Sequence, residues 1–146
     1  MRISAKGRYA LAALIEIARQ TEIGEVVSVV SISEKLGISK IFLEQTAMLL
    51  KKGGLIQSTK GAKGGYQLAR KASAISALDI LSVVENTLLE KTDATGQSPA
   101  TETALKEKVF DKLDKAIETC LAGVTVKDLL EYADLQNSEQ AFMLNM

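Results

Sequence analysis

The sequence predicts a mainly α-helical fold that carries one small β-hairpin. In several segments, apolar residues recur every three or four positions between serine or threonine caps and glycine stops, which is the pattern of amphipathic helices. The segment Ser58–Lys71, STKGAKGGYQLARK, instead joins two short apolar runs through a glycine-rich turn, as a hairpin does. The 146 residues suffice for one domain with its own core, or for a small domain with an oligomerisation arm.

The first helix is predicted over residues 2–20, with Ser4 able to cap its first turn. After a turn at residues 24–25, the run Val26–Val30 is rich in β-branched valine and is predicted as a short strand. The apolar stripe of the first helix comprises Leu11, Leu14, Ile15 and Ala18.

A helix-turn-helix is predicted directly after this strand. Ser31 and Glu34 have the spacing of a capping box, and Gly37 stands where a glycine ends a helix. Ser39 can cap the next helix, which is predicted over residues 40–52. Two helices joined by so few residues form a helix-turn-helix. The core stripe of the second helix is Leu43, Ala47 and Leu50, and the residues largely outside it include Lys40, Glu44, Gln45 and Lys51.

The hairpin follows the helix-turn-helix, which is the order of a winged helix. Its strands are predicted over residues 55–58 and 66–69. A tip built of glycine lets backbone N–H groups approach a phosphate or enter a minor groove, and lysines supply charge for that approach. Taken alone, the hairpin fits a plain exposed turn equally well. The tip residues predicted to contact nucleic acid are Lys60, Gly61, Lys63 and Gly64.

Further helices are predicted over residues 76–86, 101–121 and 125–133. The polar segment 91–100 holds the only proline and is predicted as a loop or linker. The long helix has to bury its apolar stripe either against a second subunit or against its own head. The apolar end of the tail after residue 136 is either tucked into the fold or offered to a partner. The residues predicted for a homodimer contact are Leu105, Val109, Leu113 and Ile117.

The predicted organisation is a winged helix-turn-helix domain over residues 1–90, a linker loop over 91–100, and a dimerisation helix with a C-terminal helix and tail over 101–146. Charge is divided unequally along this organisation. Residues 1–72 hold twelve Lys and Arg against five Asp and Glu, whereas residues 73–146 hold six against thirteen. This asymmetry is expected when one part meets a polyanion such as double-stranded DNA; the alternative is chance clustering of surface charge.

The composition argues against several other classes of protein. The chain has no histidine, so the commonest general base and zinc ligand are missing, and no nucleophile elbow or phosphate-binding loop is present. We therefore expect no enzyme and no catalytic residues. The single cysteine, Cys120, rules out an intramolecular disulfide. No apolar run reaches the roughly 20 residues of a membrane span, and no signal-peptide pattern is found, so a cytoplasmic protein is expected.

Three motifs resemble the Rrf2 family of bacterial winged-helix transcriptional regulators. They are MRISAKGRYAL at the N-terminus, ISKIFLEQ at the second helix of the helix-turn-helix, and KGAKGGYQLARK at the wing. The resemblance covers nearly the whole chain in the right order. It implies a homodimer, with winged heads held apart by the long helix, that binds partly palindromic promoter DNA as a repressor.

The resemblance also implies roles for single residues. The family's base-reading positions match Glu44 and Gln45. Gln45 can hydrogen-bond the edge of an adenine, and Glu44 can accept a hydrogen bond from a cytosine or exclude other bases. Ser39 would meet a phosphate at the helix start. Lys60 stands where many members carry a wing arginine, which implies weaker minor-groove insertion. Phosphate anchoring is implied for Lys6, Arg8 and Tyr9, with helix packing as the alternative for Tyr9.

Many family members hold an iron–sulfur cluster on three cysteines before the long helix. Residues 91–104 contain no cysteine and no histidine, so no metal and no other cofactor is expected, and Cys120 is interpreted as a small apolar residue rather than a redox switch. The C-terminal run VKDLLEYADLQNSEQAFMLNM is similar to cluster-free regulators of cysteine metabolism in Gram-positive bacteria, whose DNA affinity rises in complex with cysteine synthase. That synthase binds partner peptides ending in isoleucine, whereas this chain ends in Met146.

Two alternatives to a repressor of cysteine genes stay open. One is an interaction module that keeps the fold and acts mainly by binding a metabolic enzyme such as cysteine synthase. The other is an Rrf2 regulator of a different stress or redox response.

Overall fold

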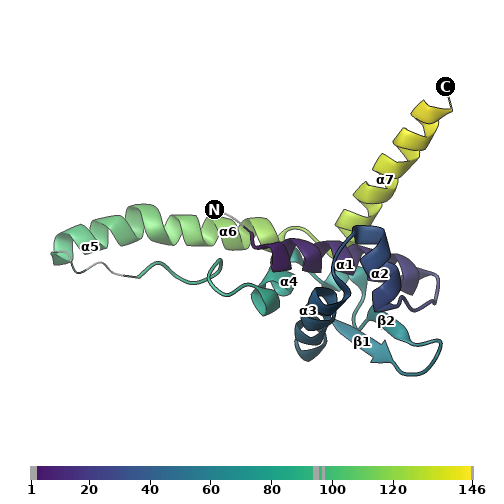
Figure 1. The fold of residues 1–146 in the computed structure, drawn as a ribbon. Coiled ribbons are helices and arrows are strands. Elements are labelled where there is room, and N and C mark those ends of the chain that lie inside the picture. Colours follow the sequence, from purple (N-terminus) through teal and green to yellow (C-terminus); the bar gives the residue numbers. More distant parts are fainter. Residues whose placement is uncertain (1–2, 94–95, 97, 146) are drawn as a thin grey trace.

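The structure is a computed structural model that describes residues 3–93, 96 and 98–145. It consists of a head from which two helical arms project in different directions (Figure 1). This arrangement confirms the predicted class, since the described elements are mainly helices with one small antiparallel hairpin. No helix among the described residues is both long and apolar enough to cross a lipid bilayer.

Helix α1 spans Ala5–Glu22 and lies at the centre of the head. The predicted cap is confirmed, because the Ser4 hydroxyl accepts a hydrogen bond from the N–H of Gly7 at 3.0 Å. Residue 2, at the predicted start of this helix, lies outside the described residues. The face that α1 turns to the core includes Ala10, Ala13, Leu14, Ile17 and Ala18.

Helix α2 spans Val29–Leu36, so the predicted strand over Val26–Val30 is wrong. Ser28 caps this helix by accepting from the N–H of Ser31 at 3.1 Å, three residues before the predicted capping box begins. The valines favour a strand locally, but the Ser28 cap and the burial of Ile32 in the core favour a helix. Of the predicted strand, Val27 alone forms a β-bridge.

Helix α3 spans Lys40–Lys52, as predicted. The link from α2 is short because Gly37 ends that helix in the left-handed conformation at φ 65°. The Ser39 hydroxyl then accepts from the N–H of Phe42 at 3.1 Å and caps α3. The predicted core stripe of α3, Leu43, Ala47 and Leu50, is buried.

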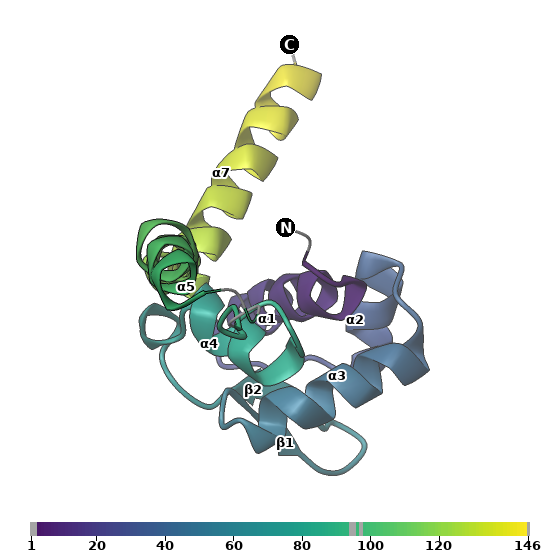
Figure 2. The ribbon, with the colours of Figure 1, turned by 90° about the vertical axis from the view of Figure 1, so that its left-hand side faces the viewer.

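The wing consists of β1 (Ile56–Thr59) and β2 (Gly65–Leu68), paired antiparallel with Ile56 opposite Leu68. The prediction placed both strands correctly to within one residue. A bridge joins the wing to the loop before α2: the N–H of Val27 donates to Tyr66 at 3.1 Å, and the N–H of Tyr66 donates back at 2.8 Å. In Figures 1 and 2, α3 and the hairpin lie on one side of the head, and α7 leaves from the other.

A short 3₁₀ turn, Ala72–Ala74, leads into α4, which spans Ala77–Val84. Ser76 and Asp79 form a capping box at its start, with hydrogen bonds of 3.0 and 2.9 Å. Helix α4 is short, and one face of it is fully enclosed in the head. Its buried residues are Ala77, Ile80, Leu81 and Val84.

The first arm is continuous helix from Pro99 to Ala122. It comprises α5 (Pro99–Leu105), a π-helical turn (Lys106–Phe110) and α6 (Asp111–Ala122). The predicted loop over 91–100 therefore ends earlier than expected, because Ser98 caps the helix and Pro99 takes its first position, where no N–H is needed. Residues 94, 95 and 97 of that predicted loop lie outside the described residues.

The second arm is α7, which spans Val126–Leu144 and is much longer than the predicted helix over 125–133. Its first turns belong to the head, because Val126 and Leu130 are buried in the core. The guanidinium of Arg19 donates to the carboxylate of Asp134 and so links α1 to α7. Beyond these contacts, the rest of α7 extends away from the head (Figures 1 and 2).

Candidate nucleic-acid interface

The outward face of α3 carries the residues predicted to read bases. Glu44 and Gln45 are both exposed, on the side of the helix away from the core stripe. Lys40 is exposed in the first turn, next to the Ser39 cap. Because the first N–H groups of a helix lack partners within it, this end of α3 suits a phosphate oxygen.

The start of α1 lies against α3 through an aromatic pair. The rings of Tyr9 and Phe42 meet edge to face, with centroids 5.4 Å apart and planes at 90°. Tyr9 is half-buried in this contact, whereas Arg8 is exposed and Lys6 is half-buried. Helix packing thus accounts for the Tyr9 ring. Lys6 lies near the recognition helix, because it lines the same hollow as Phe42.

A carboxylate from α4's end fixes the first turn of α1. One oxygen of Glu85 accepts from the backbone N–H of Ser4 at 3.0 Å and from its hydroxyl at 2.7 Å. Sequence reasoning missed Glu85, because the contact joins residues 81 positions apart. This carboxylate orients the segment that carries Lys6 and Arg8.

The wing tip holds two exposed lysines, Lys60 and Lys63, as predicted. Its glycines are required by the turn itself. Gly61 has φ 108°, and a Cβ on Gly64 would lie 2.1 Å from the carbonyl oxygen of Thr59. The tight turn therefore explains these glycines without any bound ligand.

One hydrogen bond and one electrostatic interaction link side chains of α3 to the wing strands. The Lys51 amine donates to the Ser58 hydroxyl at 2.8 Å. Burial, and secondly the negative charge of Glu44, raise the pKa of the Tyr66 phenol above its ordinary value of 10.0. The Lys51–Ser58 hydrogen bond and the electrostatic effect of Glu44 on Tyr66 link the recognition helix to the hairpin, so the two elements form one surface.

Two large apolar residues stand on the same outward face and were not among the predicted site residues. Ile41 is 70% exposed and Met48 is 68% exposed. A helical wheel signals both positions, since Ile41 precedes Glu44 by three residues and Met48 follows it by four.

The residues predicted for dimerisation on the first arm differ in their exposure. Val109 and Leu113 are 49% and 54% exposed, and Cys120 is exposed as well. Leu105 and Ile117 are half-buried, and Ile117 faces the chain's own head.

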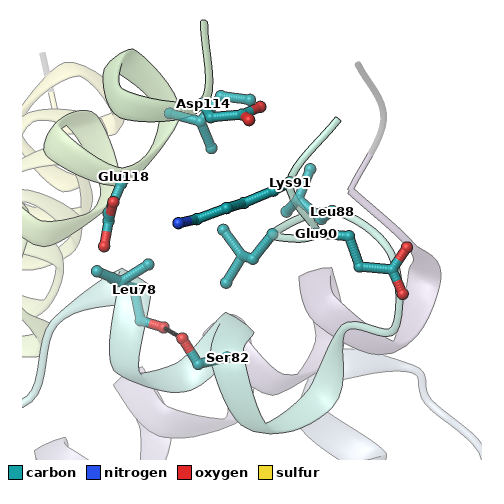
Figure 3. A pocket seen from close by; sticks show the side chains of 9 residues that line it. Leu78, Ser82, Leu88, Glu90, Lys91, Asp114 and Glu118 are labelled. Atoms are coloured by element: carbon teal, nitrogen blue, oxygen red, sulfur yellow. Dashed lines mark hydrogen bonds between the residues drawn. The ribbon is translucent and has the colours of Figure 1, made fainter. Parts of the chain in front are cut away.

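Ile117 lines a cavity of about 210 Å³ between α4, the segment after it, and α6. Figure 3 shows Lys91 lying across this cavity, with its amine toward Glu118. Leu78 and Leu88 give it apolar walls, and carboxylates stand at its rim. The cavity lies where the first arm leaves the head.

Comparison with known proteins identifies the family. A family model described as "Rrf2: Iron-dependent Transcriptional regulator" matches residues 3–132. The chain belongs to the Rrf2 family. The relatives it resembles are transcriptional regulators, and their function agrees with the prediction that the chain is not an enzyme.

Two Rrf2 regulators illustrate the likeness in sequence. The HTH-type regulator CymR of Bacillus subtilis (strain 168) is 34% identical over 143 residues, covering 98% of each chain. The HTH-type regulator IscR of Yersinia enterocolitica is 33% identical over 147 residues, covering 95% of this chain and 88% of the other.

Solved structures of Rrf2 proteins match the fold as well. CymR (YrzC), the global cysteine regulator of B. subtilis, superposes with a TM-score of 0.76 at 33% identity, covering 90% of this chain and 98% of that one. IscR of T. potens gives 0.73 at 35% identity, covering 91% and 88%.

The Rrf2 description mentions iron, but this chain's residues do not fit an iron site. Clusters are held by cysteine thiolates or, in some, by histidines, and mononuclear iron commonly needs histidine. The sequence has one cysteine and no histidine. Within residues 3–93, 96 and 98–145, no three Cys, Asp or Glu side chains come together as a metal site.

Proposed function

We propose that this Rrf2 chain is a cytoplasmic, homodimeric repressor that binds promoter DNA without an iron–sulfur cluster and controls genes of cysteine and sulfur metabolism. The observation that supports DNA binding best is the joint surface of α3 and the wing. Exposed Glu44 and Gln45 lie on α3, which is linked by a hydrogen bond to a hairpin that carries two exposed lysines. The basic half of the sequence forms this surface.

In this proposal α3 enters the major groove and the wing follows the adjacent backbone. Gln45 pairs with an adenine edge, while Glu44 accepts from cytosine or disfavours other bases. Lys60 approaches the minor groove or a phosphate. The remaining proposed contacts, mainly to phosphate, are Lys6, Arg8, Tyr9, Ser39, Lys40, Gly61, Lys63 and Gly64.

The exposed apolar side chains on the first arm support a homodimer. Val109 and Leu113 project from a helix that leaves the head, so a second copy of the same helix could cover them. Leu105 is proposed to extend this contact. Ile117 would join it only at its margin, because it already packs toward its own head.

The assignment to cysteine metabolism is supported by the likeness to CymR, which extends over nearly all of both chains. Cysteine synthase is then a candidate partner. A second candidate function is an enzyme-binding module, and the end of α7 supports it. Nothing in the described chain covers the apolar side chains there, which are Phe142, Met143 and Leu144. Met146, the C-terminal residue of the proposed partner peptide, lies outside the described residues.

A salt titration tests the proposed function. Wild type, Gln45→Ala and Lys60→Ala are titrated onto fluorescent fragments of the host's promoters, with Lys127→Ala, an exposed lysine at the start of α7, as the control. We expect Gln45→Ala to lose about 1–3 kcal/mol on the cognate site, and Lys60→Ala to lower the salt slope by about one. Lys127→Ala should leave the salt dependence of DNA binding the same as in wild type.

Absence of salt-dependent binding to every promoter fragment would contradict the proposal. If binding stays weak until purified cysteine synthase is added, the enzyme-binding module is favoured. Deleting residues 136–146 then tests whether α7 makes that contact while DNA binding stays intact.

A further inference from the structure

Ile41 occupies the outermost line of the recognition helix. With about 100° per residue, the buried residues of α3 centre on a direction almost opposite to Ile41, and Met48 points within about 20° of Ile41. Gln45 lies about 40° to one side of Ile41. An exposed apolar side chain is ordinary on a protein surface, but here it stands at the centre of the face that carries the polar base-reading residues.

We propose that Ile41 is a specificity-determining residue that recognises the 5-methyl group of a thymine in the major groove. The inference rests on the proposed function, because it requires α3 to enter that groove. Among the base edges exposed there, thymine alone presents a methyl group. An isoleucine can make no hydrogen bond, so its favourable contact in the groove is with that methyl.

Position along the helix favours Ile41 over Met48. Residues near the N-terminus of a recognition helix reach the base edges, and Ile41 is the second residue of α3, whereas Met48 lies two turns further along. Ile41 and Gln45 are separated along the axis by about 6 Å, which is roughly two base-pair steps of 3.4 Å. The recognised thymine therefore lies within about two base pairs of the adenine that Gln45 contacts.

The test removes the methyl group and the side chain separately. A duplex that wild type binds is selected from random sequence, and each thymine of a half-site is replaced in turn by deoxyuridine, which lacks only the methyl. Kd is measured for the full-length wild type and for Ile41→Ala. Ile23→Ala is the matched control, since Ile23 is 69% exposed at the end of α1, outside the recognition helix.

We expect one thymine whose replacement weakens wild-type binding about fourfold, as expected for one methyl-sized group buried. The same replacement should leave the Kd of Ile41→Ala unchanged, whereas the Kd of Ile23→Ala should rise about fourfold as it does for wild type. Ile41→Val, which retains two methyl groups, should keep part of the sensitivity and serves as the second variant if the alanine protein folds poorly.

Equal deoxyuridine effects at every thymine in wild type and in both Ile41 variants would overturn the inference. In that case salt-dependent duplex binding persists and the proposed function stands. If no duplex is bound in a salt-dependent manner, the proposed function fails, and the role of Ile41 fails with it.

Discussion

Replacing Gly65 by alanine should destabilise the head at the junction between the wing and the loop before α2. An added Cβ would lie 2.5 Å from the carbonyl oxygen and 2.7 Å from the carbonyl carbon of Val27. These are backbone atoms, so they cannot rotate away as the end of a flexible side chain can. The substitution must separate Val27 from Tyr66 and break two backbone hydrogen bonds, of 2.8 and 3.1 Å. At about 1 kcal/mol each, the expected loss in the free energy of unfolding is ~2 kcal/mol.

Urea unfolding followed by circular dichroism measures this loss, with all variants at one protomer concentration because association shifts apparent stability. For a chain of this size the same loss lowers Tm by about 4–8 °C. The matched control is Gly123→Ala, because an added Cβ there meets no atom closer than 3.4 Å and φ is −81°. This control should be neutral or stabilising by about 0.4–1 kcal/mol. If both variants behave alike, the close approach of Gly65 to Val27 does not limit stability.

Three further outcomes follow from contacts of single carboxylates. Glu44→Gln should lower the pKa of Tyr66 toward its ordinary value without reaching it, because burial remains the larger cause of the shift. Ultraviolet titration of the phenol measures this pKa. An unchanged pKa would mean that the charge of Glu44 does not act on Tyr66. Glu85→Ala removes the acceptor of two Ser4 hydrogen bonds and should lower the free energy of unfolding by about 1–3 kcal/mol. Thermal melting measures this loss, and an unaltered Tm would mean that these hydrogen bonds do not stabilise the fold. Hydrogen bonds from the backbone and the side chain of Thr125 hold the pKa of Asp128 below its ordinary value of 3.8. The ionised carboxylate therefore stabilises the fold above pH 3.8, and this stabilisation is lost as the pH falls through the lower pKa of the folded state. Asp128→Asn should therefore show a smaller acid-induced loss of stability, and equal acid limbs for both proteins would disprove the effect.

Local signals in the sequence predicted the recognition helix well. The capping hydroxyl of Ser39 and the left-handed Gly37 act within a few residues of themselves, so a linear pattern reveals them. Such caps set helix boundaries whatever the rest of the fold does.

The errors arose where two local signals competed. The valines before α2 favour a strand, but the Ser28 cap starts a helix among them. Pro99 was assigned to a loop, although proline suits the first position of a helix. In both places the choice depends on whether the following residues can bury an apolar face.

The candidate site was predictable in its residues and unpredictable in its pairings. The outward positions of Glu44 and Gln45 follow from helical spacing alone. The electrostatic effect of Glu44 on Tyr66 and the hydrogen bond between Ser4 and Glu85 depend on tertiary packing between distant segments. No periodicity in a single sequence contains that information.

The burial of Val126 and Leu130 in the head bears on how the protein is made. Synthesis runs from the N-terminus, so a ribosome has completed α3 and the wing long before it adds the start of α7. Until that start emerges, the apolar face of α1 that receives it is open to water and to other chains. The core of the head is therefore complete only once Leu130 has been added. A chain that stops before Val126 would leave this apolar face of α1 exposed and would be prone to aggregation.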